Sequence, residues 1–239
     1  MIVKGGYTNY GEAIGILMLD TRFPRPVGDI GNALSFPFPV RYKKIKCASP
    51  QKIVREADVS LLDPFIKGAQ QLEKEGVKAI TTSCGFLAMF QKEMAASVNI
   101  PVFTSSLIQV PFLYNLMGKK GRVGILTASS TSLTEKHFRG VGMEDIPVAI
   151  AGMDDMEEFT GVFLGNKTDL NVKKCEKELV TKALQLINEN PDVNMIVLEC
   201  TNMSPYRKRI QKATQKPVFD IITLVKYVYS GVEFLSQYL

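Results

Sequence analysis

The chain has little of what metal sites, nucleotide sites and membrane spans require. It has one histidine, His137, and no C-x-x-C pair among its four cysteines, so a zinc site is not expected. It contains neither a G-x-G-x-x-G string nor a P-loop string, so no nucleotide is implied. No apolar run approaches the roughly 20 residues that cross a bilayer. We therefore expect no metal, no cofactor and no membrane partner.

The excess positive charge is spread thinly along the chain. The 239 residues carry a net charge of +5 from scattered lysines and arginines, without the basic block and interleaved aromatic residues that nucleic-acid binding favours. The N-terminal region lacks the basic, apolar and small-residue segments of a signal peptide. We therefore expect a cytoplasmic protein without a nucleic-acid partner, with its cysteines reduced. Its 46% hydrophobic content can bury one large or two small domains.

Two segments of the chain match each other without a gap, and each carries a cysteine at the same place. Residues 80–103 align with residues 196–219 when Cys84 is set against Cys200. The tripeptide Pro-Val-Phe begins seventeen residues after each cysteine, and aromatic and apolar residues recur six and ten positions after it. We infer two duplicated halves that face each other across a cleft, with one thiol on each wall.

Hydrophobic patterning predicts strands that alternate with helices. Strands are expected at residues 14–19, 38–45, 77–82, 122–127, 147–150 and 195–199, and helices near 59–72, 86–94, 130–139, 171–190 and 221–239. The strands are apolar throughout, which is typical of parallel strands covered on both faces.

This alternation predicts an α/β fold with two pseudo-symmetric lobes, flavodoxin-like or Rossmann-like, each built on a parallel sheet. Residues 1–117 plus 218–239 are expected to form the first lobe, which carries Cys84, and residues 118–217 the second, which carries Cys200. Loops after the strands gather along one edge of such sheets and bind ligands there. The active site is therefore expected in the cleft between the lobes, with the long loop at residues 21–32 as a candidate binding loop.

Cys84 and Cys200 each follow a strand and precede a helix. At such a turn the helix dipole and free backbone N–H groups lower the pKa of a thiol and favour the thiolate. Two acid/base groups on opposite faces of a carbon acid can remove and return a proton without a cofactor. Burial as a small apolar residue is the alternative for any free cysteine. That explanation is preferred for Cys175, which lies in an apolar helical pattern, and Cys47 stays unassigned.

Polar residues at the same strand ends are candidates for binding the substrate, although serine and threonine also cap helices there. Asp20 could accept a substrate ammonium, and Arg22 and Arg25 could bind a carboxylate. Glu199 precedes Cys200 but is expected to point to the other face of its strand, and His137 is expected at the surface. The candidate substrate-binding residues are Asp20, Thr82, Ser83, Gly85, Thr127, Ser130, Thr131, Thr201 and Asn202.

The strings TTSCGF at residues 81–86 and ECTNM at residues 199–203, with Asp20 ending the first strand, resemble the aspartate/glutamate/hydantoin racemase superfamily over nearly the whole chain. The resemblance implies two pseudo-symmetric lobes and a reaction without pyridoxal phosphate or metal. It also implies that Cys84 and Cys200 act as opposed acid/base groups and that Thr201 binds the substrate carboxylate.

The residues beside the cysteines depart from the glutamate racemases, which follow the first cysteine with Asn-Thr and the second with Thr-His. Here Gly85 and Phe86 follow the first, and Thr201 and Asn202 follow the second. The string TTSCGF is closer to the branch of arylmalonate decarboxylases and maleate isomerases.

We therefore expect a cofactor-independent racemase of an aspartate-like amino acid or related small carbon acid. Its partner is a small-molecule carboxylate or amino acid, and a homo-oligomer is compatible with the sequence. The alternatives are a decarboxylase or cis-trans isomerase of a dicarboxylic acid, and a non-catalytic two-lobed ligand sensor.

Overall fold

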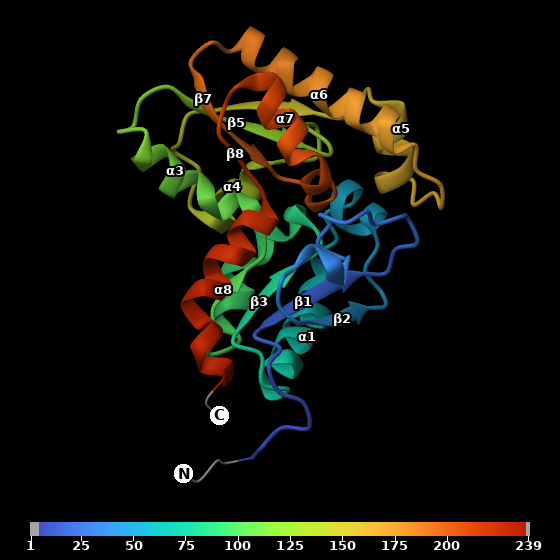
Figure 1. Ribbon diagram of the computed structural model, residues 1–239, viewed down its shortest axis with the longest axis vertical. Coiled ribbons are helices and arrows are strands. Elements are labelled where there is room, and N and C mark those ends of the chain that lie inside the picture. The colour runs from blue at the N-terminus through green and yellow to red at the C-terminus, as the bar shows by residue number, and fades with distance from the viewer. Residues whose placement is uncertain (1–4, 238–239) are drawn as a thin grey trace.

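The computed structural model describes residues 5–237, and it contains two four-stranded parallel sheets in two stacked lobes (Figure 1). The first sheet has the order β2-β1-β3-β4 and the second the order β6-β5-β7-β8, so the two lobes share one topology. This confirms the predicted two-lobed α/β fold. The strands are β1 (Ile14–Leu19), β2 (Val40–Ile45), β3 (Ala79–Thr82), β4 (Val102–Phe103), β5 (Arg122–Thr127), β6 (Val148–Gly152), β7 (Val193–Leu198) and β8 (Val218–Phe219).

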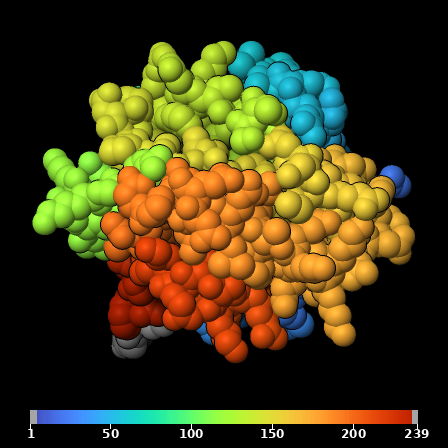
Figure 2. Space-filling view, turned by 90° about the horizontal axis from the view of Figure 1, so that it is seen from above, coloured from blue at the N-terminus to red at the C-terminus, as the bar shows by residue number. Residues whose placement is uncertain are grey.

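Helices cover both faces of each sheet. The α-helices are α1 (Leu62–Lys74), α2 (Gln91–Ala96), α3 (Val110–Leu116), α4 (Glu135–Val141), α5 (Glu157–Phe159), α6 (Val172–Glu189), α7 (Arg207–Thr214) and α8 (Ile221–Gln237). Short 3₁₀ or π turns lie at Ala33–Ser35, Gln51–Arg55, Val59–Leu61, Gly85–Phe90, Ser106–Gln109, Thr160–Leu164 and Thr201–Tyr206. Seen from above the second lobe, α6 and α7 cover much of its outer face in orange tones (Figure 2).

The repeated Gly-Ile-Leu of the two first strands has a packing cause. A Cβ on Gly15 in β1 would lie 2.9 Å from Leu72 of α1, and a Cβ on Gly124 in β5 would lie 2.9 Å from the side chain of Val193. Both contacts are closer than side chains tolerate, so glycine lets the neighbouring apolar side chains lie directly on the strand. The same requirement at equivalent places explains why the duplicated halves kept the same residue.

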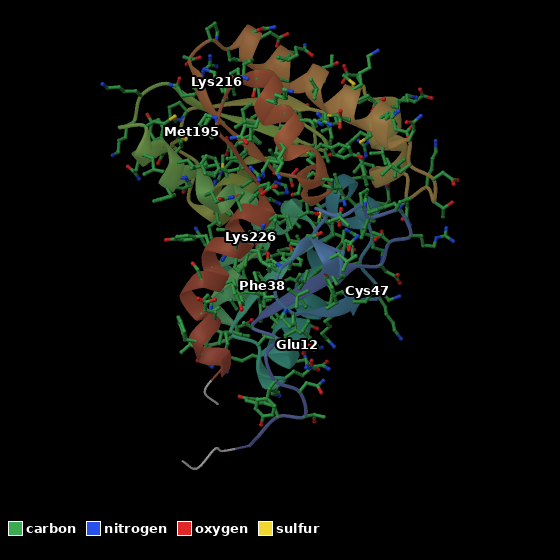
Figure 3. The ribbon with its side chains drawn as sticks, viewed as in Figure 1. Glu12, Phe38, Cys47, Met195, Lys216 and Lys226 are labelled. Atoms are coloured by element: carbon green, nitrogen blue, oxygen red, sulfur yellow. The ribbon has the colours of Figure 1, made fainter. Side chains whose placement is uncertain are left out.

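The C-terminal helix α8 crosses back to the first lobe (Figure 1). Its Ile221 and Val225 are fully buried in one apolar cluster with Ile14 and Ile16 of β1. Phe38, labelled in Figure 3, stacks on Tyr229 of α8 with ring centroids 3.6 Å apart. The short strand β8 before it pairs with β7 of the second sheet. We therefore propose the expected domain division with one correction: β8, expected in the first lobe with residues 218–239, belongs to the second sheet because it pairs with β7, while α8 stays with the first lobe.

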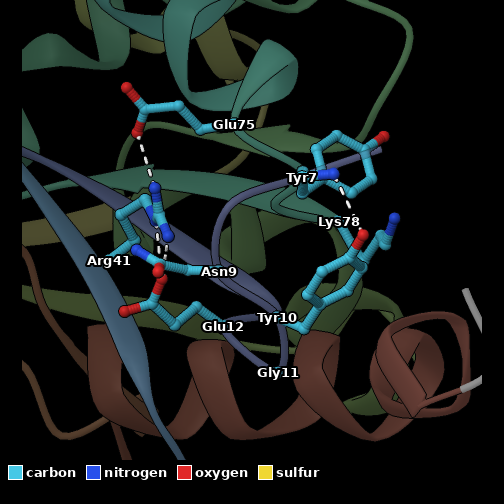
Figure 4. Close-up of a pocket in the computed structure, with 9 residues that line it drawn as sticks. Tyr7, Asn9, Tyr10, Gly11, Glu12, Arg41, Glu75 and Lys78 are labelled. Carbon is cyan, nitrogen blue, oxygen red and sulfur yellow. Dashed lines mark hydrogen bonds and ion pairs between the residues drawn. The ribbon is translucent and has the colours of Figure 1, made fainter. Parts of the chain in front are cut away.

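A polar cluster fixes the segment that precedes β1 at the edge of the first sheet opposite the cysteine turns (Figure 4). The Arg41 guanidinium pairs with Glu12 and, at 3.0 Å, with Glu75, while Tyr7 and Tyr10 meet edge to face. The hollow among these residues measures ≈ 10 Å³, which is too small for a ligand. Its role is to hold the chain where it enters the fold.

The single histidine is buried, so the prediction of a surface position was wrong. His137 is 1% exposed, and its Nδ1 accepts a hydrogen bond from the backbone N–H of Thr134, where α4 begins. Its ring meets the edge of Phe86 with centroids 5.1 Å apart. Burial lowers the pKa of His137 to about 4, so it is neutral and acts as a helix cap.

Among residues 5–237, no helix is both long and apolar enough to span a bilayer. The same residues place no three His, Cys, Asp or Glu side chains where they could share a metal ion.

Candidate active site

The two cysteine turns meet at one small cavity between the lobes. Its volume is ≈ 20 Å³, about the space of one water molecule. Both Cys84 and Cys200 line it, which agrees with the duplication seen in the sequence. The full lining is Leu19, Phe23, Arg25, Pro50, Val54, Ser83, Cys84, Phe86, Ala128, Phe163, Leu164, Glu199, Cys200 and Asn202.

The two thiols occupy equivalent positions. Cys84 follows β3 and precedes the 3₁₀ helix Gly85–Phe90, and Cys200 follows β7 and precedes the 3₁₀ helix Thr201–Tyr206. The backbone N–H of Phe86 lowers the pKa of the Cys84 thiol, and that of Asn202 lowers the pKa of the Cys200 thiol. The Cys200 thiol also donates to Asn202 Oδ1 at 3.5 Å. Each extended cysteine therefore presents its sulfur to the first N–H groups of the turn that follows.

Both thiols are nevertheless protonated at neutral pH, so the predicted lowering of the thiol pKa was wrong. Burial raises the pKa of the Cys84 thiol to about 12, and the negative charge of Glu199 adds to this effect. The N–H of Phe86 and the charge of Arg25 act in the opposite direction but do not outweigh it. Burial, followed by the charge of Glu199, also raises the pKa of the Cys200 thiol well above its ordinary range.

Glu199 is the charged group that the sequence argument misplaced. Its side chain is fully buried, lines the cavity and lies against the cysteine turn of the first lobe. A Cβ on Gly85 would be 2.2 Å from Glu199 Oε1. The other oxygen, Oε2, accepts hydrogen bonds from the Thr127 hydroxyl at 2.8 Å and from the Ala128 N–H at 3.4 Å. Burial raises the pKa of the Glu199 carboxyl to about 7 against these two hydrogen bonds.

The loop at residues 21–32 reaches across to the second lobe and covers the cavity. The backbone N–H of Arg22 donates to Asn166 at 2.8 Å. The Asp29 carboxylate accepts from Asn202 at 2.7 Å and pairs with Arg25 at 2.6 Å. A chain of polar contacts thus joins this loop to the turn of Cys200, and it brings the Arg25 guanidinium to the cavity wall.

Five of the candidates named from the sequence line the cavity: Arg25, Ser83, Cys84, Cys200 and Asn202. Two more support the turns from behind. The Thr82 hydroxyl bonds to the carbonyl of Thr104 at 2.7 Å. The Thr201 hydroxyl donates to the carbonyl of Ser83 at 2.8 Å, which links the two lobes.

The remaining candidates lie outside the lining. Asp20 pairs with Lys44 at 3.1 Å on the surface. Ser130 and Thr131 bond to the Asp154 carboxylate, which follows β6. Thr127 and Gly85 border the cavity through their contacts with the Glu199 carboxyl. Sequence reasoning missed Phe23, Phe163 and Pro50 as lining residues because apolar residues far apart in the sequence carry no local signal of a shared cavity.

Comparison with known proteins places the chain in an enzyme family. A family model described as Asp/Glu/Hydantoin racemase matches residues 47–225, so the chain belongs to the Asp/Glu/Hydantoin racemase family. A glutamate racemase from Francisella tularensis, solved in complex with D-glutamate, shares the fold with a TM-score of 0.53 at 15% identity over 96% of this chain and 83% of that one. The fold matches the crystal structure of a putative Asp/Glu racemase from Yersinia pestis, with a TM-score of 0.59 at 13% identity over 92% of this chain and 99% of that one. It also matches unliganded arylmalonate decarboxylase, with a TM-score of 0.54 at 15% identity over 87% of this chain and 86% of that one.

Curated relatives have a more specific name. The chain is 33% identical over 227 residues to a dimethylsulfoniopropionate lyase of Durusdinium sp. clade D, which covers 92% of this chain and 74% of that protein. It is 29% identical over 222 residues to dimethylsulfoniopropionate lyase 7 of Emiliania huxleyi (strain CCMP1516), which covers 88% of this chain and 64% of the relative. The chain thus spans less than two thirds of the Emiliania protein.

These relatives overturn the predicted amino-acid racemase activity. At 29–33% identity they are lyases by name, so membership of the racemase family holds while the predicted reaction was wrong. The alternative predicted from the sequence, on the branch of the decarboxylases, agrees better with them because decarboxylases are also lyases.

Proposed function

We propose that this chain is a lyase that cleaves dimethylsulfoniopropionate or a close relative of it. The observation that carries the proposal is the apolar cavity in which Cys84, Cys200 and Glu199 meet. It offers proton-accepting groups in a space the size of about one water molecule. The dimethylsulfoniopropionate lyases among the relatives, which match 88–92% of the chain, support this choice of reaction.

The reaction balances with one base. A thiolate takes a proton from the carbon beside the substrate carboxylate. The electron pair left on that carbon forms the new double bond to the neighbouring carbon. The bond from that carbon to sulfur breaks, and its electron pair leaves on dimethyl sulfide. Acrylate, dimethyl sulfide and one proton, held at first on the cysteine sulfur, are the products.

Cys84 is the better candidate for this base. The charge of Arg25 lowers the pKa of Cys84, whereas the charge of Asp29 adds to the rise at Cys200. The thiolate therefore forms at lower energetic cost on Cys84. Cys200, protonated on the matching turn, is suited to hold a proton near the substrate. Arg25, with the hydroxyl of Ser83 and the amide of Asn202, supplies the polar side chains that would bind the substrate carboxylate.

Substrate entry requires the cavity to open. A volume of ≈ 20 Å³ holds about one water molecule, and the proposed substrate is several times larger. Three hydrogen bonds join the lobes around the cavity: Arg22 to Asn166, Asn202 to Asp29, and Thr201 to Ser83. Breaking the first two would free the loop at residues 21–32 to open over the substrate, as in enzymes with lids.

Release of dimethyl sulfide is the direct test. Reduced protein is incubated with dimethylsulfoniopropionate, dimethyl sulfide is measured in the headspace by gas chromatography, and acrylate is measured by proton NMR. We expect the two products in equal amounts from the wild type. The Cys175→Ser variant is the matched control, since that thiol is buried in α6 away from the cavity. Folded protein that releases neither product across the neutral and mildly alkaline range would refute the proposal.

A further inference from the structure

The buried Glu199 carboxyl has an oxygen without a protein partner. Within residues 5–237, Oε1 accepts no hydrogen bond although it is buried, while Oε2 accepts two. A carboxylate in such surroundings is costly unless a positive charge or a donor reaches it. Because Oε1 lies beside Gly85, at the turn of Cys84, a ligand bound between the two thiols would come close to it.

Three phenylalanine rings share the cavity with this carboxyl. Phe23 comes from the loop after β1, Phe86 from the turn after Cys84 and Phe163 from the second lobe. The rings of Phe23 and Phe163 meet edge to face with centroids 5.1 Å apart. The face of an aromatic ring attracts cations, methylated onium ions among them. Phe23 already accepts one, since the guanidinium carbon of Arg25 lies 4.6 Å from its centroid.

The rest of the lining favours an onium group over a primary ammonium. An ammonium carries three N–H donors that each need an acceptor. The acceptors nearby are engaged: the Ser83 carbonyl by Thr201, and the Asp29 carboxylate by Arg25 and Asn202. The remaining walls include Leu19, Val54, Ala128 and Leu164. A sulfonium group with methyl substituents has no N–H donor, so one carboxylate and apolar walls satisfy it.

We propose that Glu199 together with Phe23, Phe86 and Phe163 forms a subsite for a methylated onium group, which gives the enzyme its preference for a sulfonium substrate. This inference rests on the proposed function and adds to it the residues that recognise the leaving group. The cavity lining then carries one cation, Arg25, for the carboxylate of the substrate, and one anion, Glu199, for its sulfonium.

A pair of uncleavable probes isolates this subsite from catalysis. Trimethylammonioacetate and tert-butylacetate have the same shape and the same carboxylate, but only the former carries an onium charge. Binding of each is measured by isothermal titration calorimetry. We expect the wild type to bind the betaine at least about tenfold more tightly, which corresponds to about 1.4 kcal/mol. Glu199→Gln should lose this preference, and Phe163→Leu should reduce it several-fold.

Phe65→Leu is the matched control, because Phe65 is a fully buried phenylalanine of α1 outside the cavity lining. It should keep the wild-type preference. Equal binding of the two probes by the wild type, no binding of the betaine by folded protein, or a preference retained in Glu199→Gln would each overturn the subsite. The binding readout needs no turnover. A betaine preference without release of dimethyl sulfide supports the subsite and refutes the lyase, and release without the preference does the reverse.

Discussion

Replacing Gly85 with alanine tests how closely the two cysteine turns approach each other. A Cβ at this position would lie 2.2 Å from Glu199 Oε1 and 2.3 Å from the Glu199 carbonyl oxygen. The carboxyl group can rotate away, but the carbonyl oxygen belongs to the backbone at the end of β7. Relief to an ordinary contact of 3.4 Å therefore requires the turns to separate by about 1 Å.

Two consequences follow from that shift. Overpacking of this kind costs about 1–3 kcal/mol of stability, and each kcal/mol lowers the melting temperature of a chain of this size by roughly 2–4 °C. A displacement of about 1 Å at a catalytic group can also lower the rate about 100-fold. Both are measured on one preparation, by differential scanning calorimetry and by kcat/KM for release of dimethyl sulfide.

Gly231→Ala is the matched control. Gly231 lies in α8, and among the described residues no atom beyond its chain neighbours and the adjacent backbone of α8 lies within 4 Å of the Cβ it would gain. Alanine there should leave activity unchanged and raise stability by up to about 1 kcal/mol, because glycine is a poor helix former. If Gly85→Ala matched the wild type in both measurements, the two cysteine turns would not meet as closely as described, and the placement of Glu199 between them would be wrong.

Three further predictions concern single side chains. Cys84→Ser should lower kcat for dimethyl sulfide release by about 10²–10⁴-fold, as expected for loss of a base, and by more than Cys200→Ser does; equal losses would contradict the choice of Cys84. The folded state raises the pKa of Glu199 to about 7, so this group's contribution to the free energy of unfolding is present below pH ~4.5 and falls by about 3 kcal/mol as the pH rises to ~7. Urea denaturation of wild type and Glu199→Gln across this range should show their difference changing in that direction, and a constant difference would count against it. Burial lowers the pKa of His137 to about 4, so its effect on stability has the opposite sign. The free energy of unfolding falls by roughly 3 kcal/mol as the pH falls from ~6.5 to ~4. His137→Gln keeps a side chain able to cap α4 and should resist acid denaturation better than the wild type.

The duplication explains why the fold could be predicted in detail. Aligning Cys84 with Cys200 also aligned the strands before them and the Pro-Val-Phe strands after them. In the structure these are the third and fourth strands of two sheets with the same order. β1 and β5 were predicted at their observed bounds, because continuous apolar runs between turn residues leave few alternatives. The short turns within residues 130–139 were less predictable, and α4 begins at Glu135.

The orientation of Glu199 could not be predicted from strand alternation. In a regular strand, adjacent side chains point to opposite faces, which would separate Glu199 from Cys200. The strand β7 ends at Leu198, so both residues lie beyond it, where the alternation no longer holds. Both line the cavity. The predicted strand ended at residue 199, one residue later than β7 does. That one-residue error led to the wrong orientation for Glu199, the side chain that most affects the two thiols.

Side-chain partners brought by distant segments explain most other differences. Ser130 and Thr131 follow β5 as expected. Their hydroxyls donate hydrogen bonds to the carboxylate of Asp154, in the segment after β6. Asp20 lies after β1 as expected, but Lys44 of the neighbouring strand draws it to the surface. Strand ends can be placed from local patterns, whereas the competition between neighbours for a polar group depends on the folded packing.

The raised pKa values of the two thiols favour a substrate that carries a positive charge. A thiol with a pKa of about 12 is rarely ionised at neutral pH, and the charge of Glu199 opposes ionisation further. A cation bound at about 4 Å would contribute roughly 4 kcal/mol at an effective dielectric constant near 20, equal to about 3 pKa units. A sulfonium substrate brings that charge with it, and by pairing with Glu199 it also removes the opposing one. The base is then formed mainly when the substrate is present. Burial, which makes the empty site unreactive, also strengthens this coupling, because the interaction between the charges is screened less in a closed apolar cavity than in water.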